Sequence, residues 1–297
     1  YGMQTVPEIL KKIRKLELRT RRFVETAFAG QYHSVFKGRG MNFDEFRLYD
    51  FGDEIRSIDW NVTARMGEPF VRKYVEEREL TVMLLIDVSA SGSFGSVSAS
   101  KRELAAEVAS LLAFCAIRNS DKVGLILFTD RVELYIPPKK GRTHILRLIR
   151  EILFYEPVGR KTDLAKALDF LNRVTMRRAV VFVISDFHTA NYEKALTICS
   201  RRHDLIAVVI EDPGEQSLPP IGPVRVEDPE SGAIFEIDFS NPRVRSEFRK
   251  RAEQERTERE TMLRRKSIDS IALRTDQDYF PALRSFFLRR ESRLRGR

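Results

Sequence analysis

The feature that most constrains this sequence is a set of continuous apolar runs in its middle. They are Thr81–Ile86, Val123–Phe128, Ala179–Ile184 and Leu205–Ile210. Runs of this length without polar alternation are typical of strands covered on both faces, as in a parallel sheet. Helical periodicities separate them, at Lys101–Ile117, His144–Phe154, Leu164–Val174 and Tyr192–Ser200. The alternation predicts an α/β fold with right-handed crossovers and a doubly wound, mostly parallel, Rossmann-like sheet.

Differences in composition and periodicity divide the chain into regions 1–79, 80–211 and 212–297. The first is charged and aromatic, and an amphipathic helix is expected from about Pro7 to Ala29. The second holds the strands and helices above, and its segment Val132–Ile136 is expected to return as an antiparallel edge strand after a tight turn. The third is expected to contain a hairpin, a long charged helix, a last strand and a closing helix, at Val224–Phe239, Pro242–Lys266, Ser270–Leu273 and Tyr279–Arg290.

The composition narrows the class of protein. Hydrophobic residues make up 42% of the 297 residues, so a sizeable core can be buried, and the net charge is +9 with basic segments at Lys11–Arg22 and Arg284–Arg297. Solvated helix faces are the preferred interpretation of these segments, and nucleic-acid binding stays open as an alternative. No apolar run approaches the roughly 20 residues that span a bilayer, and no signal peptide is visible. A cytoplasmic protein that reaches membranes only through partners is expected.

The cysteines and histidines carry no recognisable site. Cys115 and Cys199 each lie in an apolar helical pattern, which predicts buried free thiols rather than a disulfide. The histidines are scattered singly, without the spacing of a zinc site.

Oxygen-bearing side chains follow the predicted strands at the points where those strands end. Asp87, Ser89 and Ser91 form a D-x-S-x-S loop after the first strand, Thr162 precedes a predicted helix, and Asp186 ends the strand at Ile184. In open α/β sheets, ligands bind at the carboxyl ends of the strands, so all five can converge there. Such hard oxygen donors select Mg²⁺, or alternatively Mn²⁺ or Ca²⁺, over zinc.

Each of these residues also has a structural interpretation. Ser89 and Ser91 could cap the helix that follows, Thr162 could be the N-cap of its own helix, and Asp186 could be an ordinary turn residue. The combination favours a metal site. Two carboxylates and three hydroxyls would leave the ion incompletely neutralised, so an outside carboxylate could complete its coordination.

These five residues resemble the metal-ion-dependent adhesion site of von Willebrand factor A (VWA) domains, over about residues 80–211. A longer stretch, Arg47–Arg65 (RLYDFGDEIRSIDWNVTAR) with Val71-Arg72 and Glu76–Glu79, resembles the bacterial DUF58 family. The second resemblance covers nearly the whole chain. One difference lies in the loop that carries Thr162, called here the threonine loop. Lys161 precedes Thr162 at a position where the resembling sequences usually have glycine.

The DUF58 resemblance implies a partner. Family members are typically encoded beside MoxR-type AAA+ ATPases and are proposed to act with them in chaperone-like or maturation roles. The expected function is therefore a metal-dependent protein-binding module that captures an acidic residue of such an ATPase or its client. No small-molecule substrate is expected.

The signature stretch allows two interpretations. Its charges could form an ion-pair lattice that fixes the N-terminal segment to the α/β domain, with Trp60 as a packed anchor. Alternatively they could form a partner-docking surface, for which the candidates are Arg47, Asp53, Arg56, Asp59 and Arg65.

An enzyme is the main competing function. Asp87 could be the nucleophile of a Mg²⁺-dependent hydrolase or phosphotransferase. Such an enzyme would need a second acid two residues on to protonate the leaving group, and Ser89 occupies that position. No glycine-rich phosphate loop follows a strand, so the expectation is that the protein is not an enzyme.

Overall fold

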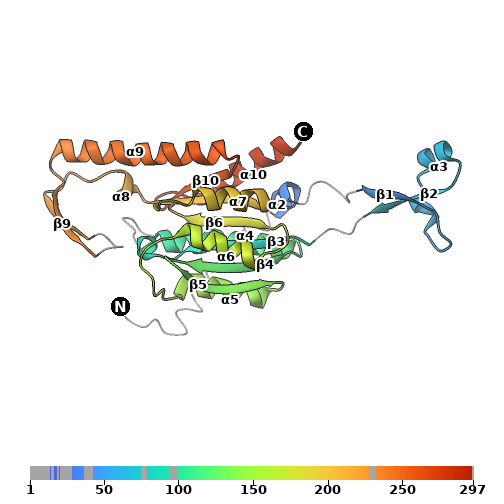
Figure 1. Cartoon of the computed structure of the whole chain (residues 1–297), viewed down its shortest axis with the longest axis horizontal. Coiled ribbons are helices and arrows are strands. Elements are labelled where there is room, and N and C mark those ends of the chain that lie inside the picture. Colours follow the sequence, from blue (N-terminus) through green and yellow to red (C-terminus); the bar gives the residue numbers. More distant parts are fainter. Residues whose placement is uncertain are drawn as a thin grey trace.

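A six-stranded sheet with the order β10-β7-β6-β3-β4-β5 runs through the main body of the computed structural model (Figure 1). The structure describes residues 14, 17, 18, 20, 29–36, 43–74, 79–93, 100–227 and 232–295. The sheet is parallel except for the β4–β5 pair, which is antiparallel. This confirms the predicted fold class and the edge strand. The strands are β3 (Thr81–Asp87), β4 (Lys122–Phe128), β5 (Val132–Lys139), β6 (Val180–Ser185), β7 (Asp204–Glu211) and β10 (Asp269–Arg274).

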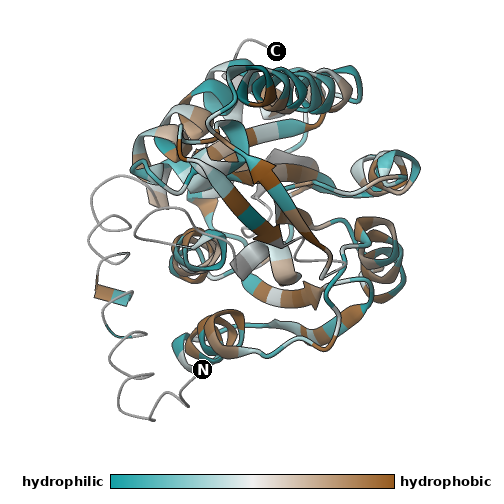
Figure 2. Ribbon diagram, turned by 90° about the vertical axis from the view of Figure 1, so that its left-hand side faces the viewer, coloured by the Kyte–Doolittle hydropathy of each residue, from teal (hydrophilic) through white to brown (hydrophobic). Residues whose placement is uncertain are grey.

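Helices cover both faces of this sheet. One face packs against α2 (Ala29–Phe36), α4 (Lys101–Arg118), α5 (Arg142–Phe154) and α10 (Tyr279–Arg295). The other packs against α6 (Leu164–Val174), α7 (Glu193–Arg202) and the end of α9 (Pro242–Arg265). The rest of α9 is exposed, and it is mainly hydrophilic in Figure 2, as its alternating charges predict.

Strand β3 shows why the apolar runs are continuous. Successive side chains of a strand point to opposite faces. Val82, Leu84 and Ile86 enter the core under α4, whereas Met83 and Leu85 enter the core under α6. Every position from 82 to 86 is therefore buried, and none can be polar without a partner.

All regions of the sequence contribute to this body. Strand β10 pairs in parallel with β7, so the last predicted strand belongs to the main sheet. Helix α2 packs beside α10, where the rings of Tyr32 and Phe287 lie 6.4 Å apart and both side chains are fully buried. Ser34 Oγ donates a hydrogen bond of 2.7 Å to Glu291 Oε1. The sequence boundaries at 79/80 and 211/212 are thus crossed by core contacts.

Two smaller units lie outside the sheet. The hairpin predicted in the C-terminal region is present as β8 (Pro223–Glu227) and β9 (Ile234–Asp238), preceded by the short helix α8 (Pro213–Gln216). Residues 43–74, the N-terminal module, lie apart from the sheet in Figure 1. The helix expected from Pro7 falls largely outside the described residues. The module contains β1 (Phe43–Leu48), η2 (Ile55–Ser57), α3 (Trp60–Met66) and β2 (Phe70–Tyr74).

Predictions drawn from composition can also be compared with the structure. Cys115 and Cys199 are buried free thiols, as expected. Burial raises the pKa of the Cys199 thiol to about 12, so it is protonated at neutral pH. Among the described helices, none combines the length and the apolar character that crossing a bilayer requires.

Candidate metal centre

The five predicted oxygen donors lie in three loops at the carboxyl edge of the sheet. Asp87 ends β3, and Ser89 and Ser91 follow it around the short 3-10 helix η3 (Ala90–Ser93). Thr162 lies just before α6, and Asp186 comes directly after β6. Because β3 and β6 are adjacent parallel strands, their carboxyl ends meet at the same edge.

Hydrogen bonds tie each pair of these loops together. They run from Ala90 N to Arg160 O (3.0 Å), from Thr189 Oγ1 to Thr162 O (2.9 Å), and from Ser185 Oγ to Asp87 Oδ2 (2.8 Å). The β3 loop is thereby joined to the threonine loop, the threonine loop to the β6 loop, and the β6 loop back to β3. These contacts hold together, at one edge of the sheet, the three loops that carry the predicted donors.

Asp87 is a partly buried carboxylate, and both of its oxygens accept hydrogen bonds. Its Oδ1 accepts a hydrogen bond of 2.9 Å from the Ser89 backbone N–H, and its Oδ2 accepts the bond from Ser185. Burial, with the nearby charge of Asp186, raises the pKa of Asp87 to about 6. A bound divalent cation would stabilise the ionised form.

The serine hydroxyls face each other rather than a helix terminus. Ser89 is 1% exposed, and its Oγ lies 3.0 Å from Ser91 Oγ. The alternative interpretation, that they cap the next helix, is wrong. The N-cap of α4 is Ser100, which forms a capping box with Glu103.

The side-chain hydroxyl of Thr162 is buried and available for coordination. Its Oγ1 is buried and has no hydrogen-bond partner among the described residues. The N-cap of α6 is Asp163, whose side chain accepts a hydrogen bond from Lys166 N, so Thr162 is not the cap. Buried polar atoms nearly always have a partner, and this hydroxyl is therefore available to coordinate an ion or a water.

A support for the threonine loop escaped the sequence analysis. The Glu133 carboxylate accepts hydrogen bonds from Thr129 Oγ1 and from the backbone N–H groups of Val158 and Gly159. A Cβ on Gly159 would lie 2.2 Å from Thr129 Oγ1, so the loop passes too close for another residue. Lys161 is not among the described residues with positive φ, so lysine fits there without backbone strain.

Asp186 is paired with a buried lysine that sequence reasoning also missed. Lys101 Nζ donates a hydrogen bond of 2.7 Å to Asp186 Oδ2 and also contacts the Glu215 carboxylate on α8. Burial alone would raise the pKa of Asp186, but the ammonium of Lys101 outweighs it, so the pKa is lowered. A cavity of about 20 Å³, the size of a single water or ion, is lined by Asp87, Ser91, Lys101 and Asp186 among others.

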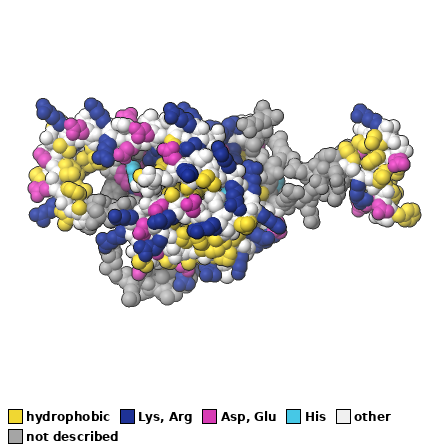
Figure 3. Space-filling model, viewed as in Figure 1, with side chains coloured by type: hydrophobic (Ala, Val, Ile, Leu, Met, Phe, Trp, Pro, Cys, Tyr) yellow, Lys and Arg dark blue, Asp and Glu magenta, His cyan; other side chains and the backbone are white. Residues whose placement is uncertain are grey.

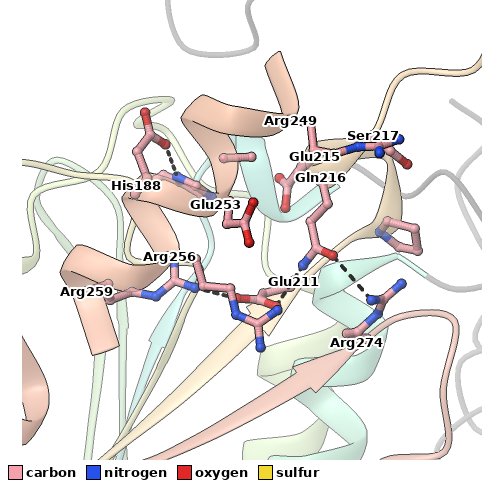
Figure 4. Close-up of a pocket in the computed structure, with 13 residues that line it drawn as sticks. His188, Glu211, Glu215, Gln216, Ser217, Arg249, Glu253, Arg256, Arg259 and Arg274 are labelled. Carbon is pink, nitrogen blue, oxygen red and sulfur yellow. Dashed lines mark hydrogen bonds and ion pairs between the residues drawn. The ribbon is translucent and has the colours of Figure 1, made fainter. Parts of the chain in front are cut away.

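A second layer of charges surrounds this centre. Arg259 of α9 pairs with Glu211 at the end of β7, and its guanidinium lies 3.4 Å from the Asp186 carbonyl oxygen. Figure 4 shows this pair beside Gln216, which bridges Glu211 and Arg274. The surrounding pocket, between α8 and α9, has a volume of about 420 Å³. Its charges are of both signs.

The chemistry of the donors fits a hard divalent cation. Within the described part of the chain, no group of three or more His, Cys, Asp or Glu side chains is placed to hold a metal ion. An ion at this edge would therefore depend on the hydroxyls of Ser89, Ser91 and Thr162 beside the two aspartates. This set would not suit zinc, and it leaves room for an outside ligand.

The proposed docking residues lie elsewhere, in the N-terminal module. Arg47 pairs with Asp53 at 2.5 Å, and Asp59 caps α3 by accepting hydrogen bonds from the backbone N–H groups of Asn61 and Val62. Arg56 and Arg65 are exposed. These contacts connect residues within the module. The expectation that Trp60 is a packed anchor is wrong, because its side chain is 66% exposed.

The family of this chain follows from comparison with known proteins. A family model described as "Protein of unknown function DUF58" matches residues 45–258. The chain belongs to the DUF58 family. Uncharacterized DUF58-like relatives from Mycobacterium bovis and Mycobacterium tuberculosis are each 32% identical over 293 residues, covering 98% of this chain and 91% of theirs.

Solved structures similar to this DUF58 chain share less than a fifth of its sequence. An aerotolerance-related membrane protein from Bacteroides fragilis is 17% identical, with a TM-score of 0.46, and covers 72% of this chain and 99% of its own. BatB from Bacteroides thetaiotaomicron (15%, TM-score 0.42) has the same coverage. The SpRpn10 VWA domain (12%, TM-score 0.36) covers 70% and 94%. These TM-scores are below 0.5, and the fold is defined by the strand order and pairing of this chain, a mixed, mostly parallel six-stranded sheet.

Proposed function

We propose that this DUF58 protein is a divalent-metal-dependent protein-binding module, an adaptor or co-chaperone that works with a MoxR-type AAA+ ATPase or its client. The observation that carries the proposal is the buried hydroxyl of Thr162, unpartnered among the described residues, on a loop tied to those of Asp87 and Asp186. Mg²⁺ is the expected ion, with Mn²⁺ and Ca²⁺ as alternatives. The ion would supply an electrophilic point for an incoming carboxylate.

Binding is favoured because the protein's own ligands do not complete a shell. The two aspartates are the carboxylates among the five donors, and the remaining oxygens are neutral hydroxyls. An aspartate or glutamate of a partner would add the missing charged ligand, and such a charge-assisted contact is switched by the metal.

Catalysis is not part of the proposal. Both carboxylate oxygens of Asp87 already accept hydrogen bonds, which holds it as a fixed ligand rather than a free nucleophile. Two residues on, Ser89 has a hydroxyl that cannot serve as the acid a phosphate leaving group needs. Metal-dependent hydrolysis detected in an activity assay would instead support the alternative function, a hydrolase.

The N-terminal module supplies a second contact surface for the same partner. Its large apolar side chains are exposed at many positions, and they appear as yellow patches on the separate unit in Figure 3. Exposed apolar clusters of this kind are typical of protein interaction sites. We call them the module surface: Phe46, Leu48, Phe51, Ile55, Trp60 and Met66.

Metal-dependent capture tests the proposal directly. The tagged DUF58 chain is used to capture a MoxR-type AAA+ ATPase, with Mg²⁺ and with EDTA. We expect capture with Mg²⁺ and its loss with EDTA and in the double variant Asp87→Asn/Ser91→Ala. The control Asp169→Asn removes a carboxylate from an exposed position of α6 and should capture normally.

The module surface is tested in the same assay. Phe51→Ser with Trp60→Ser should reduce capture with Mg²⁺ while leaving metal binding by calorimetry unchanged. Equal capture with Mg²⁺, with EDTA and by the Asp87→Asn/Ser91→Ala variant would show that the metal centre is not the docking point. The absence of heat on titration with Mg²⁺, Mn²⁺ and Ca²⁺ would overturn the metal assignment itself.

A further inference from the structure

Lys101 is a fixed cation inside the candidate metal centre. It is the first residue of α4, following the N-cap Ser100, and its side chain is only 4% exposed. Its ammonium donates to Asp186 at 2.7 Å and contacts Glu215. A buried ammonium persists only when it is paired, and these two carboxylates, from the β6 loop and α8, provide the pairing.

The charge of Lys101 changes what the centre can hold. Three carboxylates lie at or beside this centre, those of Asp87, Asp186 and Glu215, and Lys101 offsets one of their negative charges. With a divalent ion bound, the four side chains and the ion would be neutral overall. Without the ammonium the same loaded cluster would carry one net negative charge.

Two consequences of this arrangement oppose each other. The ammonium repels an arriving metal ion and occupies one oxygen of Asp186, so it weakens binding of the bare ion. It also makes the loaded centre one charge more positive than it would be without the lysine, so it strengthens binding of an anion at the open coordination position. Both effects are large in a site shielded from water.

We propose that Lys101 determines the ligand class of this centre: it lowers the affinity for the metal alone and makes the metal-loaded centre select a carboxylate. This inference rests on the proposed function. It explains why a carboxylate ligand rather than a neutral one completes the site. Metal and partner acid then bind cooperatively, since the metal supplies the positive charge that the acid coordinates.

A purely structural role for Lys101 makes a different prediction. As a strut between Asp186 and Glu215, it would affect the free energy of unfolding but not the affinity for metal. Arg259 has such a structural role, because from α9 it pairs with Glu211 (Figure 4). It also lies 3.4 Å from the Asp186 carbonyl oxygen. The two roles are therefore separated by measuring metal binding and unfolding on the same variants.

The experiment uses the full chain and the metal alone. Isothermal titration with Mn²⁺ compares the wild type with Lys101→Met, Lys101→Arg and the control Lys166→Met, which removes an exposed ammonium paired with Asp163 on the threonine loop. We expect Lys101→Met to bind Mn²⁺ at least tenfold more tightly. Lys101→Arg and Lys166→Met should stay close to the wild type.

The preference of the loaded centre for a carboxylate is tested by adding sodium acetate. Sodium chloride at the same ionic strength is the control. Acetate displaces water from Mn²⁺, which is followed by water-proton relaxation. We expect acetate to act on the loaded wild type and to act several-fold more weakly on loaded Lys101→Met. Where Lys101→Met folds poorly, Lys101→Gln replaces it, since its amide removes the charge but can still donate a hydrogen bond.

The outcomes separate this inference from the proposed function. If the wild type binds Mn²⁺ and Lys101→Met binds it equally, the inference fails and the proposed function stands. If Lys101→Met alone binds Mn²⁺, the native centre is not a metal site, so the proposed function fails and so does the carboxylate selection of the inference. If neither protein binds Mn²⁺, both are overturned. An equal response to acetate in the two loaded proteins also overturns the inference.

Discussion

At the sheet edge, Asp186 and Lys101 are almost wholly buried and each has charged or polar partners, whereas in the N-terminal module Phe51 and Trp60 are exposed to solvent. The edge is built from loops that hydrogen-bond to one another across long sequence separations. The module is a two-stranded sheet with a short helix, and such a unit is marginally stable by itself. The difference teaches that the edge determines its own geometry, while the module has apolar surface that no other part of the described chain covers.

The largest expected effect contrasts the two regions directly. Phe182 is fully buried in β6, where its ring lies 5.9 Å from that of Phe36. Phe182→Ala should lower the free energy of unfolding by about 3–5 kcal/mol. Trp60→Ala should change it by less than about 0.5 kcal/mol, because the ring is exposed. Urea denaturation measures both, and a comparable loss in Trp60→Ala would mean that the module is packed in solution.

A glycine tests how closely the threonine loop must approach its neighbour. Gly159→Ala would push a Cβ against Thr129, whose side chain is buried, and should lower the free energy of unfolding by about 1–3 kcal/mol. It should also weaken metal binding in calorimetry, since the loop carries Thr162. Gly30→Ala in α2 is the control, because nothing lies within 4 Å of its Cβ position. Equal stability of the two variants would show that the loop has room to move.

Glu133 gives the edge a pH dependence. Burial would raise its pKa, but hydrogen bonds from Thr129, Gly159 and Val158 outweigh this and lower it. A lowered pKa means that the ionised form stabilises the fold above the unfolded pKa, about 4.3 for glutamate, and that this contribution is lost as pH falls through the folded value. Glu133→Gln should lower the free energy of unfolding by about 0.5–1.5 kcal/mol at pH 7.

Urea denaturation of Glu133→Gln at a series of pH values checks this. The difference from the wild type should shrink below pH about 4. A difference that stays constant down to pH 3 would mean that the carboxylate charge does not hold the loop.

The smallest expected effect belongs to the module. Arg47 and Asp53 form an ion pair on its surface, where solvent and salt screen the attraction. Arg47→Met should leave the urea midpoint unchanged at both low and high sodium chloride. A salt-sensitive loss of stability would instead support the ion-pair lattice between the module and the α/β body.

Sequence periodicity was sufficient for much of the fold. The apolar runs located β3, β4, β6 and β7, because strands buried on both faces allow no polar position. It did not predict that Ser270–Leu273 pairs with β7 in the main sheet, since a short strand carries no signal for its neighbour. It also misplaced Trp60, because an aromatic ring looks the same in a core and on a docking surface.

The candidate site, like the fold, was predictable from the sequence only in part. Asp87, Ser89 and Ser91 were visible because they share one loop, and Thr162 and Asp186 because each stands at a strand end or helix start. Lys101 was invisible because its partners are 85 and 114 residues away, and a lysine at the start of a helix usually faces solvent. Glu133 was missed for a similar reason, since it supports the loop from a neighbouring edge strand.

The packing of α2 against α10 has a consequence for synthesis of the chain. Ser34 and its partner Glu291 are separated by 257 residues, which a ribosome adding roughly 5–20 residues per second makes in roughly 15–50 seconds. During that interval Tyr32 lacks the ring of Phe287, and β7 lacks β10. The nascent chain therefore presents an open sheet edge and an uncovered aromatic surface until its last segment emerges, and both attract chaperones or aggregation. Ribosome-bound chains truncated before residue 269 should thus remain sensitive to protease throughout the sheet.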